Sequence, residues 1–328
     1  MFLQLDLNDL HLRGVISLNR IHGGLFGLAV GDALGSTVEY LSKEEIIRRH
    51  GQLRDIDGGG WLGLKPGEWT DDTAMTIAVA EGILANPHDP VRRIGENFIE
   101  FANIDHPAMG LFIRIAIRKY KKLKNWQKAA EEIHKEEGLT AGNGALMRTL
   151  PVAFMYKDPA DIYMMSMMIA RMTHWEPEAG LTCCLYCLLA RDFILGTTNK
   201  VLAWEKTKDT FLGLVPPKFL GVAKKLVLDK LFDIEKRQYD NLVPSGYTVD
   251  SLACALSCFF KGSSLEEAVI RAVNLGGDAD TIGAITGGLA GVYWGFEAIP
   301  DRWLAEFSAE QINRLDDVAG GFKQIFII

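Results

Sequence analysis

The sequence predicts an all-α fold built as one domain. Apolar residues recur at helical spacing along most of the chain, whereas runs that alternate apolar with polar residues are scarce. No linker rich in proline, glycine or serine divides the 328 residues into halves. Because 48% of the residues are hydrophobic, a chain of this length can bury a large core.

The spacing of apolar residues predicts the elements in chain order. Residues 2–7 alternate apolar and polar side chains, which is typical of a short strand or arm and equally of a loosely held terminus. Residues 204–239 are more charged and contain Pro216-Pro217, so we expect helices joined by turns on the outside of the domain. The helical pattern is clearest in the segments 77–85, 91–102, 111–122, 159–172, 179–195 and 248–260.

Charge and hydropathy exclude several classes of protein. With 35 Lys and Arg against 42 Asp and Glu, the net charge of −7 argues against a protein that binds nucleic-acid phosphates. The first ten residues carry acids where a secretory signal needs basic residues. The uncharged stretch 281–296 is shorter than the roughly 20 apolar residues that span a bilayer. We therefore expect a cytoplasmic protein without a membrane span.

The five cysteines fit the same location. Cys183, Cys184 and Cys187 form one group, and Cys254 and Cys258 form another, each at helical spacing in an apolar stretch. A zinc site is the alternative, but these stretches lack the turn residues of a zinc knuckle. Buried, reduced thiols are therefore the favoured interpretation.

Glycine recurs every fourth residue in two helical segments. Because glycine in a helix interior costs roughly 1 kcal/mol relative to alanine, such a stripe needs a structural reason. Close approach of one helix to another is that reason, so we expect these two helices to be central and to touch. The stripes consist of Gly23, Gly27, Gly31 and Gly35, and of Gly283, Gly287, Gly291 and Gly295.

Carboxylates and hydroxyls concentrate in two short segments, 69–73 and 274–281. Each segment precedes an apolar helical run, so two separate helix caps would explain them. Four adjacent polar groups exceed what one cap needs, however, and Gly276-Gly277 allows the chain to turn so that Asp278 and Asp280 face one point. Clustered carboxylates repel one another unless a cation lies between them, and Mg²⁺ or Mn²⁺ prefers such oxygen ligands.

A third segment, 141–148, is a turn of small residues that ends in Arg148. Exposed backbone N–H groups followed by an arginine are suited to hold a diphosphate, although an ordinary turn has the same pattern.

Together these motifs resemble those of the ADP-ribosylglycohydrolase family, in order and from about Gly23 to Gly295. The resemblance implies an all-helical orthogonal bundle with a two-metal site at the bottom of a cleft, formed by residues 21–328 after an N-terminal arm or extension of residues 1–20. The motifs are Gly31-Asp32-Ala33-Leu34-Gly35 with Glu39, Gly58-Gly59-Gly60-Trp61, Lys65-Pro66-Gly67, Thr70-Asp71-Asp72-Thr73, Gly142-Asn143-Gly144 through Met147-Arg148, Thr173-His174 and Gly276-Gly277-Asp278-Ala279-Asp280-Thr281.

The resemblance also implies a role for individual residues. Glu39 would position or deprotonate the water or close over the substrate, and Asp32 would bond the backbone around the metal loops instead of binding metal. Catalysis would depend on Glu39, Asp72 and Asp278. The two divalent cations, Mg²⁺ or Mn²⁺, would be held by Thr70, Asp71, Asp72, Asp278, Asp280 and Thr281. ADP-ribose would be bound by Gly142, Asn143, Gly144, His174 and Tyr247.

The implied activity is removal of mono-ADP-ribose from a protein side chain, with arginine as the acceptor. One departure affects the acceptor side: Ala108 stands where an aspartate is expected, and Asp105 is the nearby candidate. Glu176 likewise replaces a second histidine. Two alternatives follow. The same chemistry could act on serine, nucleic acid or a metabolite, or the protein could neutralise an ADP-ribosyltransferase, or bind a regulatory protein, through the residues before Gly23.

Overall fold

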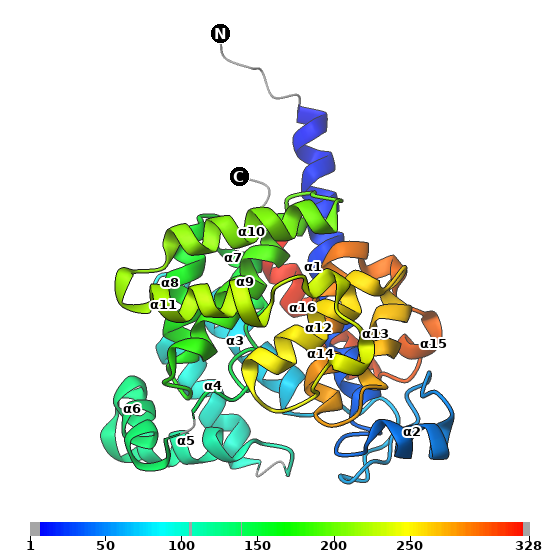
Figure 1. Ribbon diagram of the computed structural model, residues 1–328, viewed down its shortest axis with the longest axis horizontal. Helices are drawn as coiled ribbons and strands as arrows, with labels where there is room; N and C mark the ends of the chain where they lie inside the picture. The colour runs from blue at the N-terminus through cyan, green and yellow to red at the C-terminus, as the bar shows by residue number, and fades with distance from the viewer. Residues whose placement is uncertain (1–6, 105–106, 139, 324–328) are drawn as a thin grey trace.

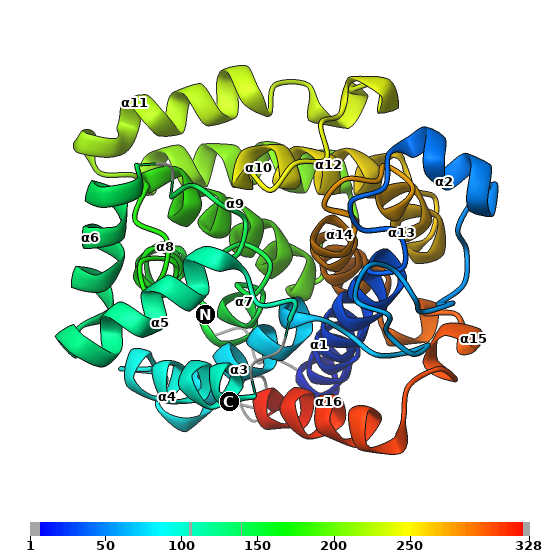
Figure 2. The same cartoon turned by 90° about the horizontal axis from the view of Figure 1, so that it is seen from below.

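Two glycine-striped helices, α1 (Leu7–Gly35) and α14 (Ala279–Trp294), pack together along the middle of the molecule (Figures 1 and 2). A Cβ atom on Gly31 would lie 2.0 Å from the carbonyl oxygen of Gly283, and one on Gly27 would lie 2.3 Å from that of Gly287. Backbone therefore packs directly on backbone. The expected contact between the two stripes is confirmed.

The structure is a computed structural model that describes residues 7–104, 107–138 and 140–323, with side chains from residue 17 onward. Within these ranges it is all-α and has no strands, which confirms the predicted class. The other helices are α2 (Lys43–His50), α3 (Asp71–Ala85), α4 (Val91–Asn103), α5 (Leu111–Leu123), α6 (Trp126–Glu137), α7 (Pro151–Met155), α8 (Pro159–Ala170), α9 (Pro177–Ile194), α10 (Lys200–Leu214), α11 (Pro217–Lys225), α12 (Thr248–Lys261), α13 (Leu265–Val273), α15 (Asp301–Leu304) and α16 (Ala309–Gly321).

The six helices expected from apolar spacing are all present, with small differences at their ends. The largest difference is in α3, which begins at Asp71, six residues before the apolar run that predicted it. Thr70 is its N-cap and accepts a hydrogen bond from the backbone N–H of Asp72. The two acids of this segment are therefore in the first turn of a helix and not in the loop before it.

Helix α9 and the central pair lie at the middle of a core to which most of the other helices contribute. Every side chain of α9 from Ala179 to Ile194 is buried, and so are those of α14 from Ala279 to Val292. A helix that is apolar on all sides belongs in the interior. Residues 204–239 form the rest of α10, then α11 and short helical turns, on the outside of the molecule as expected (Figure 2).

The division of the chain into an N-terminal arm, residues 1–20, and a domain, residues 21–328, stays a prediction. Helix α1 runs without a break through residue 20 and projects beyond the bundle at its N-terminal end (Figure 1). The alternating segment 2–7 lies, except for Leu7, outside the described residues.

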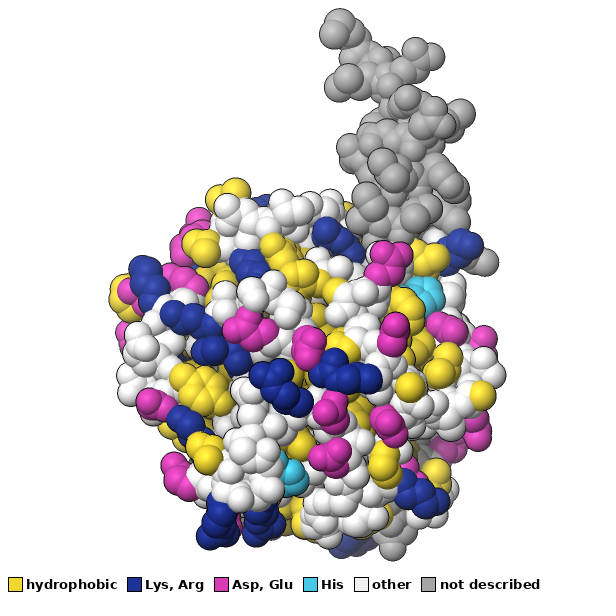
Figure 3. Space-filling model, turned by 90° about the vertical axis from the view of Figure 1, so that its right-hand side faces the viewer, with side chains coloured by type: hydrophobic (Ala, Val, Ile, Leu, Met, Phe, Trp, Pro, Cys, Tyr) yellow, Lys and Arg dark blue, Asp and Glu magenta, His cyan; other side chains and the backbone are white. Residues whose placement is uncertain are grey.

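The charge distribution on the surface and the length of the helices bear on two classes of protein, nucleic-acid binders and membrane-spanning proteins. On the face seen in Figure 3, basic and acidic side chains are interspersed and not gathered by sign. None of the described helices has both the length and the apolarity needed to cross a membrane.

Candidate metal centre

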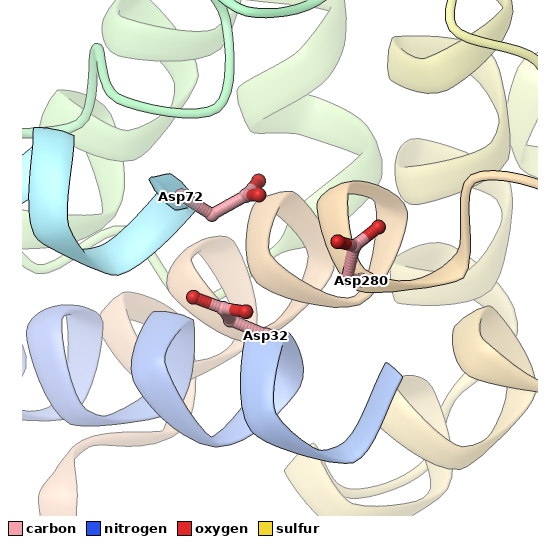
Figure 4. Close-up of side chains that lie close together, drawn as sticks. All are labelled: Asp32, Asp72 and Asp280. Carbon is pink, nitrogen blue, oxygen red and sulfur yellow. The ribbon is translucent and has the colours of Figure 1, made fainter. Parts of the chain in front are cut away.

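Three buried aspartates from three helices converge at one point (Figure 4). Asp32 lies in α1, Asp72 in the first turn of α3, and Asp280 in the first turn of α14. Each offers a carboxylate oxygen within 4.8 Å of those of the other two. The contact between α1 and α14 thus brings together acids from distant parts of the chain.

A second acidic group adjoins the first and shares Asp280 with it. Glu39, in the turn after α1, and Asp278, the N-cap residue of α14, offer oxygens within 4.8 Å of one another and of Asp280. Across the two groups, Thr281 donates to Asp72 over 3.4 Å although 209 residues separate them. Folding therefore joins the two acidic segments of the sequence into one site.

Asp32 is occupied by donors from the start of α3. Its carboxylate accepts from the backbone N–H of Thr70 at 3.0 Å, from that of Thr73 at 3.0 Å and from the Thr73 hydroxyl at 2.6 Å. This is the backbone-bonding role expected for Asp32. It fixes the helix turn that carries Asp71 and Asp72.

Burial and mutual repulsion raise the pKa of the site's carboxyl groups. Burial, followed by the charges of Asp32 and Asp71, holds the pKa of Asp72 well above its usual range. Burial raises the pKa of Asp71 to about 7, although the backbone N–H of Gly110 donates to it. Asp280 has its pKa raised by burial and then by Asp72 and Glu39. The carboxylates are thus costly to ionise together without a counter-charge.

A divalent cation fits this set of donors. Asp72 Oδ1 is buried and has no hydrogen-bond partner. The cleft above the acids has a volume of about 240 Å³, and no lysine or arginine is among the described residues that line it. Asp71, Asp72, Asp278, Asp280 and Thr281 line the cleft, while Thr70 lies beneath and donates to Asp72 over 3.1 Å. Clustered oxygen donors, one of them a carboxylate oxygen without a hydrogen-bond partner, are the chemistry that Mg²⁺ or Mn²⁺ prefers.

The Gly142–Gly144 turn forms a wall of the same cleft. Asn143 Nδ2 donates to Asp278 over 2.6 Å and to Ser251 over 2.9 Å, while its backbone N–H donates to Gly246 O over 3.0 Å. These bonds hold the turn against the acidic site. A Cβ on Gly144 would lie 3.0 Å from the His174 ring, so the absence of a side chain keeps this wall close to the histidine.

His174 is a buried, neutral ring on the cleft wall. Burial, reinforced by Arg148, lowers its pKa to about 3. Thr173 links the two: its hydroxyl lies 2.8 Å from His174 Nδ1 and accepts from Arg148 at 2.6 Å. The Arg148 guanidinium is itself fully buried and packs on the ring of Phe98, 4.7 Å from its centroid. Arg148 therefore supports the wall from behind and does not reach into the cleft.

A larger hollow of about 670 Å³ adjoins the cleft and contains Tyr247. The Tyr247 hydroxyl donates to Glu178 over 2.6 Å. Phe112, Gly142 and Gly246 line both spaces, so the two adjoin at these residues. Sequence reasoning identified Tyr247 but missed Glu178 and Phe112, which carry no motif of their own.

Two aromatic residues at the mouth of the cleft were also missed as site residues. Trp61 Nε1 donates to Glu39 over 2.5 Å, and the Tyr40 ring centroid lies 5.6 Å from that of Trp61. Trp61 belongs to the triple-glycine motif, so the sequence marked its position without indicating its partner.

Two departures from the family pattern, Ala108 and Glu176, lie beside the cleft and the larger hollow. Asp105, the candidate replacement for the missing aspartate, lies outside the described residues, whereas Ala108 lines the cleft. Glu176, which stands in place of the second histidine, lines the larger hollow. Its Oε1 lies 3.8 Å from His134 Nδ1. The five cysteines are all free and buried, as the thiol interpretation expects.

The chain is similar to several known proteins. A model of the family described as ADP-ribosylglycohydrolase matches residues 15–325. The ADP-ribosyl-[dinitrogen reductase] glycohydrolase of Rhodospirillum rubrum is 35% identical over 292 residues, 88% of this chain and 90% of that protein. ADP-ribosylarginine hydrolase Tri1 of Serratia proteamaculans is 28% identical over 303 residues, which is 91% of this chain and 78% of that protein. A solved structure titled "ADP-ribosylglycohydrolase-related protein complex" superposes with a TM-score of 0.73 at 31% identity, covering 94% and 98%.

Proposed function

Because the chain belongs to the ADP-ribosylglycohydrolase family, we propose that it removes mono-ADP-ribose from a modified protein and that the bond it cleaves is the N-glycosidic bond to arginine. The observation that carries this proposal is the meeting of the α3 and α14 acids at the base of a cleft walled by the Gly142–Gly144 turn. The names of the Rhodospirillum and Serratia relatives support the acceptor. The protein would thereby reverse ADP-ribosylation.

The acids would hold two divalent cations, Mg²⁺ or Mn²⁺. The ligands would be Thr70, Asp71, Asp72, Asp278, Asp280 and Thr281. When bound, such ions lower the pKa of a coordinated water and compensate the negative charge of the site. Of these ligands, Asp72 belongs to one of the two adjoining acidic groups and Asp278 to the other, with Asp280 in both, which supports two ions.

The cleft walls would place the substrate. The Gly142–Gly144 turn would face the diphosphate and the distal ribose, with the N–H groups of Gly142 and Gly144 as donors, since that of Asn143 donates to Gly246 O. His174 and Tyr247 would complete the ADP-ribose site from the neighbouring walls. His174 stays neutral at physiological pH because its pKa is lowered to about 3, so it would contribute a hydrogen bond and no charge.

Hydrolysis requires a water on one side of the anomeric carbon and a guanidine on the other. The water oxygen bonds to that carbon while the carbon–nitrogen bond breaks through an oxocarbenium-like state, and its electron pair goes to the guanidine. Glu39 would take the proton of the water, since burial and Asp278 raise its pKa. The proton ends on the guanidine nitrogen, so the products are ADP-ribose and an arginine side chain.

The deciding experiment measures free ADP-ribose released from an arginine-ADP-ribosylated protein. The assay is run with Mn²⁺, with Mg²⁺ and with a chelator, and in parallel on a serine-linked substrate. Metal-dependent release from arginine supports the proposal. Release from serine alone would move the activity to another acceptor, and no release from a metal-loaded protein would contradict a hydrolase.

The N-terminal residues motivate a second candidate. Because α1 projects from the bundle, it could contact an ADP-ribosyltransferase or a regulatory protein. A deletion of residues 1–18 that retains hydrolysis but loses binding to such a partner would support this role, and unchanged binding would end it.

We propose that the protein acts in the cytoplasm, where its five free thiols stay reduced.

A further inference from the structure

Tyr40 and Trp61 form an exposed aromatic pair at the mouth of the metal cleft. Tyr40 is 67% exposed and Trp61 52%, whereas most large aromatic side chains of the bundle are buried. Their ring centroids lie 5.6 Å apart with planes tilted by 49°. Tyr40 lines the cleft directly, and Trp61 is tied to it through Glu39. Two exposed rings at one point contribute little to the core, so their position needs another explanation.

The backbone holds both rings in place. Tyr40 has a φ of +64°, a left-handed conformation that a bulky residue seldom adopts. Its N–H donates to Gly277 O over 2.7 Å, which fixes it beside the start of α14. On the other segment, a Cβ on Gly60 would lie 2.1 Å from Ser36 O, so the Trp61 loop packs tightly on the turn after α1. A strained residue that is retained at a cleft is typical of a functional position.

The surroundings of the pair favour a cation. Glu39, which is not among the proposed metal ligands, accepts from Trp61, and its charge also acts on the Tyr40 hydroxyl. No lysine or arginine is among the described residues that line this cleft. The faces of tyrosine and tryptophan attract cations, and a planar guanidinium stacks on them best.

We propose that Tyr40 and Trp61 recognise the guanidinium group of the arginine acceptor and select it against uncharged acceptors such as serine. This inference rests on the proposed function and names the part of the site that gives it acceptor specificity. The pair would hold the acceptor in the substrate and would not contact the ADP-ribose portion.

The test separates acceptor recognition from ADP-ribose binding. Tyr40→Leu removes one ring, and a single cation–π contact corresponds to roughly 2- to 30-fold in binding. We expect KM for an arginine-ADP-ribosylated peptide to rise at least about fivefold, while Kd for free ADP-ribose, measured by calorimetry, changes less than about twofold. Tyr40→Phe, which keeps the ring, should restore most of the loss.

The matched control is a substitution at Phe232, an exposed aromatic residue away from the cleft. Phe232→Leu removes a ring that is 59% exposed but lies outside the residues lining the cleft, so both values should stay at those of the wild type. An active wild type whose KM is unchanged by Tyr40→Leu, or whose ADP-ribose affinity falls equally, would overturn this inference and leave the proposed function intact. A wild type that releases ADP-ribose only from serine would overturn both.

Discussion

Asn143 donates a 2.6 Å hydrogen bond to Asp278, a residue 135 positions later in the chain. The bond joins the glycine turn proposed for the diphosphate to the acids proposed for the cations. It also lowers the pKa of Asp278 against the larger effect of burial, so it helps this carboxyl to ionise. Binding of substrate and binding of metal are therefore expected to depend on each other.

Asn143→Ala should weaken Mn²⁺ binding about tenfold, because removing a partner that orients a metal ligand typically has an effect of this order. Calorimetric titration of the metal-free protein with Mn²⁺ measures it. Ser251→Ala removes the other acceptor of Asn143 and leaves the bond to Asp278, so its effect should be smaller. Equal losses in the two variants would show that the turn as a whole matters and not this bond.

Asp280→Asn should abolish activity, with kcat falling by at least about 100-fold, because Asp280 belongs to both acidic groups. The same change should raise the melting temperature of the metal-free protein at neutral pH, since it removes a buried acid whose ionisation is opposed by burial, Asp72 and Glu39. Asp55→Asn is the control, because Asp55 is an exposed acid that pairs with Arg302. A lower melting temperature for metal-free Asp280→Asn would contradict the repulsion.

The stabilisation that Mn²⁺ confers should grow as pH rises from about 4 to about 7. Unfolded aspartates ionise near pH 4, whereas burial raises the pKa of Asp32 to about 6 and that of Asp71 to about 7 in the folded, metal-free chain. The unfolded chain loses these protons first, so the stability contributed by the protonated acids is present below pH 4 and is lost as pH rises through the raised pKa values.

The measurement is the difference between melting temperatures with Mn²⁺ and with a chelator at each pH. His174 acts in the opposite direction, since its pKa is lowered and its stabilising contribution appears as pH rises. His174 makes this contribution with and without metal, so it cancels in the difference between the two melting temperatures. A difference that stays constant from pH 5 to pH 8 would exclude the acidic groups as the metal site.

Gly31→Ala should destabilise the protein by about 3 kcal/mol or more, because the new Cβ would lie 2.0 Å from the backbone oxygen of Gly283. Gly213→Ala in α10 is the matched control: nothing lies within 4 Å of its Cβ position, so it should gain about 0.5 kcal/mol from helix propensity. Urea unfolding of both variants gives the two values, and a neutral Gly31→Ala would contradict the backbone contact.

Thr173→Val should cost about 2–4 kcal/mol, because it leaves the buried Arg148 guanidinium without its hydroxyl partner. It should also weaken ADP-ribose binding, since His174 Nδ1 loses the same partner. Thr286→Val makes the same chemical change at a fully buried threonine that bonds only to the carbonyl one turn earlier, and should cost less than about 1 kcal/mol. Chemical denaturation and ADP-ribose titration compare the pair.

The helices could be predicted from the sequence because their signals are local. Apolar spacing located α4, α5 and α12 to within about a residue, and the two glycine stripes indicated which helices touch. The start of α3 was missed by six residues because its first turn is polar. Asp71 and Asp72 line a cleft, so apolar periodicity does not extend to them.

The site depends on contacts that no local pattern encodes. Clustering of Asp72 with Asp280 was expected only through the family resemblance, since distant segments must meet to form it. The bonds of Trp61 to Glu39 and of Tyr247 to Glu178 could not be inferred at all. Each joins one side chain to another across loops, where neither spacing nor charge reveals the partner.

The backbone contact between α1 and α14 limits how far substitutions can change the spacing of these two helices. No side chain lies between α1 and α14 where Gly31 meets Gly283, so ordinary substitutions in the core have nothing there to enlarge or shrink. The separation of Asp32 from Asp280 is set by the thickness of two polypeptide backbones. Mutations elsewhere in the bundle can therefore accumulate and alter stability while the distance between these acids stays constant. An engineer who wanted to move these two acids apart would have to replace facing glycines together.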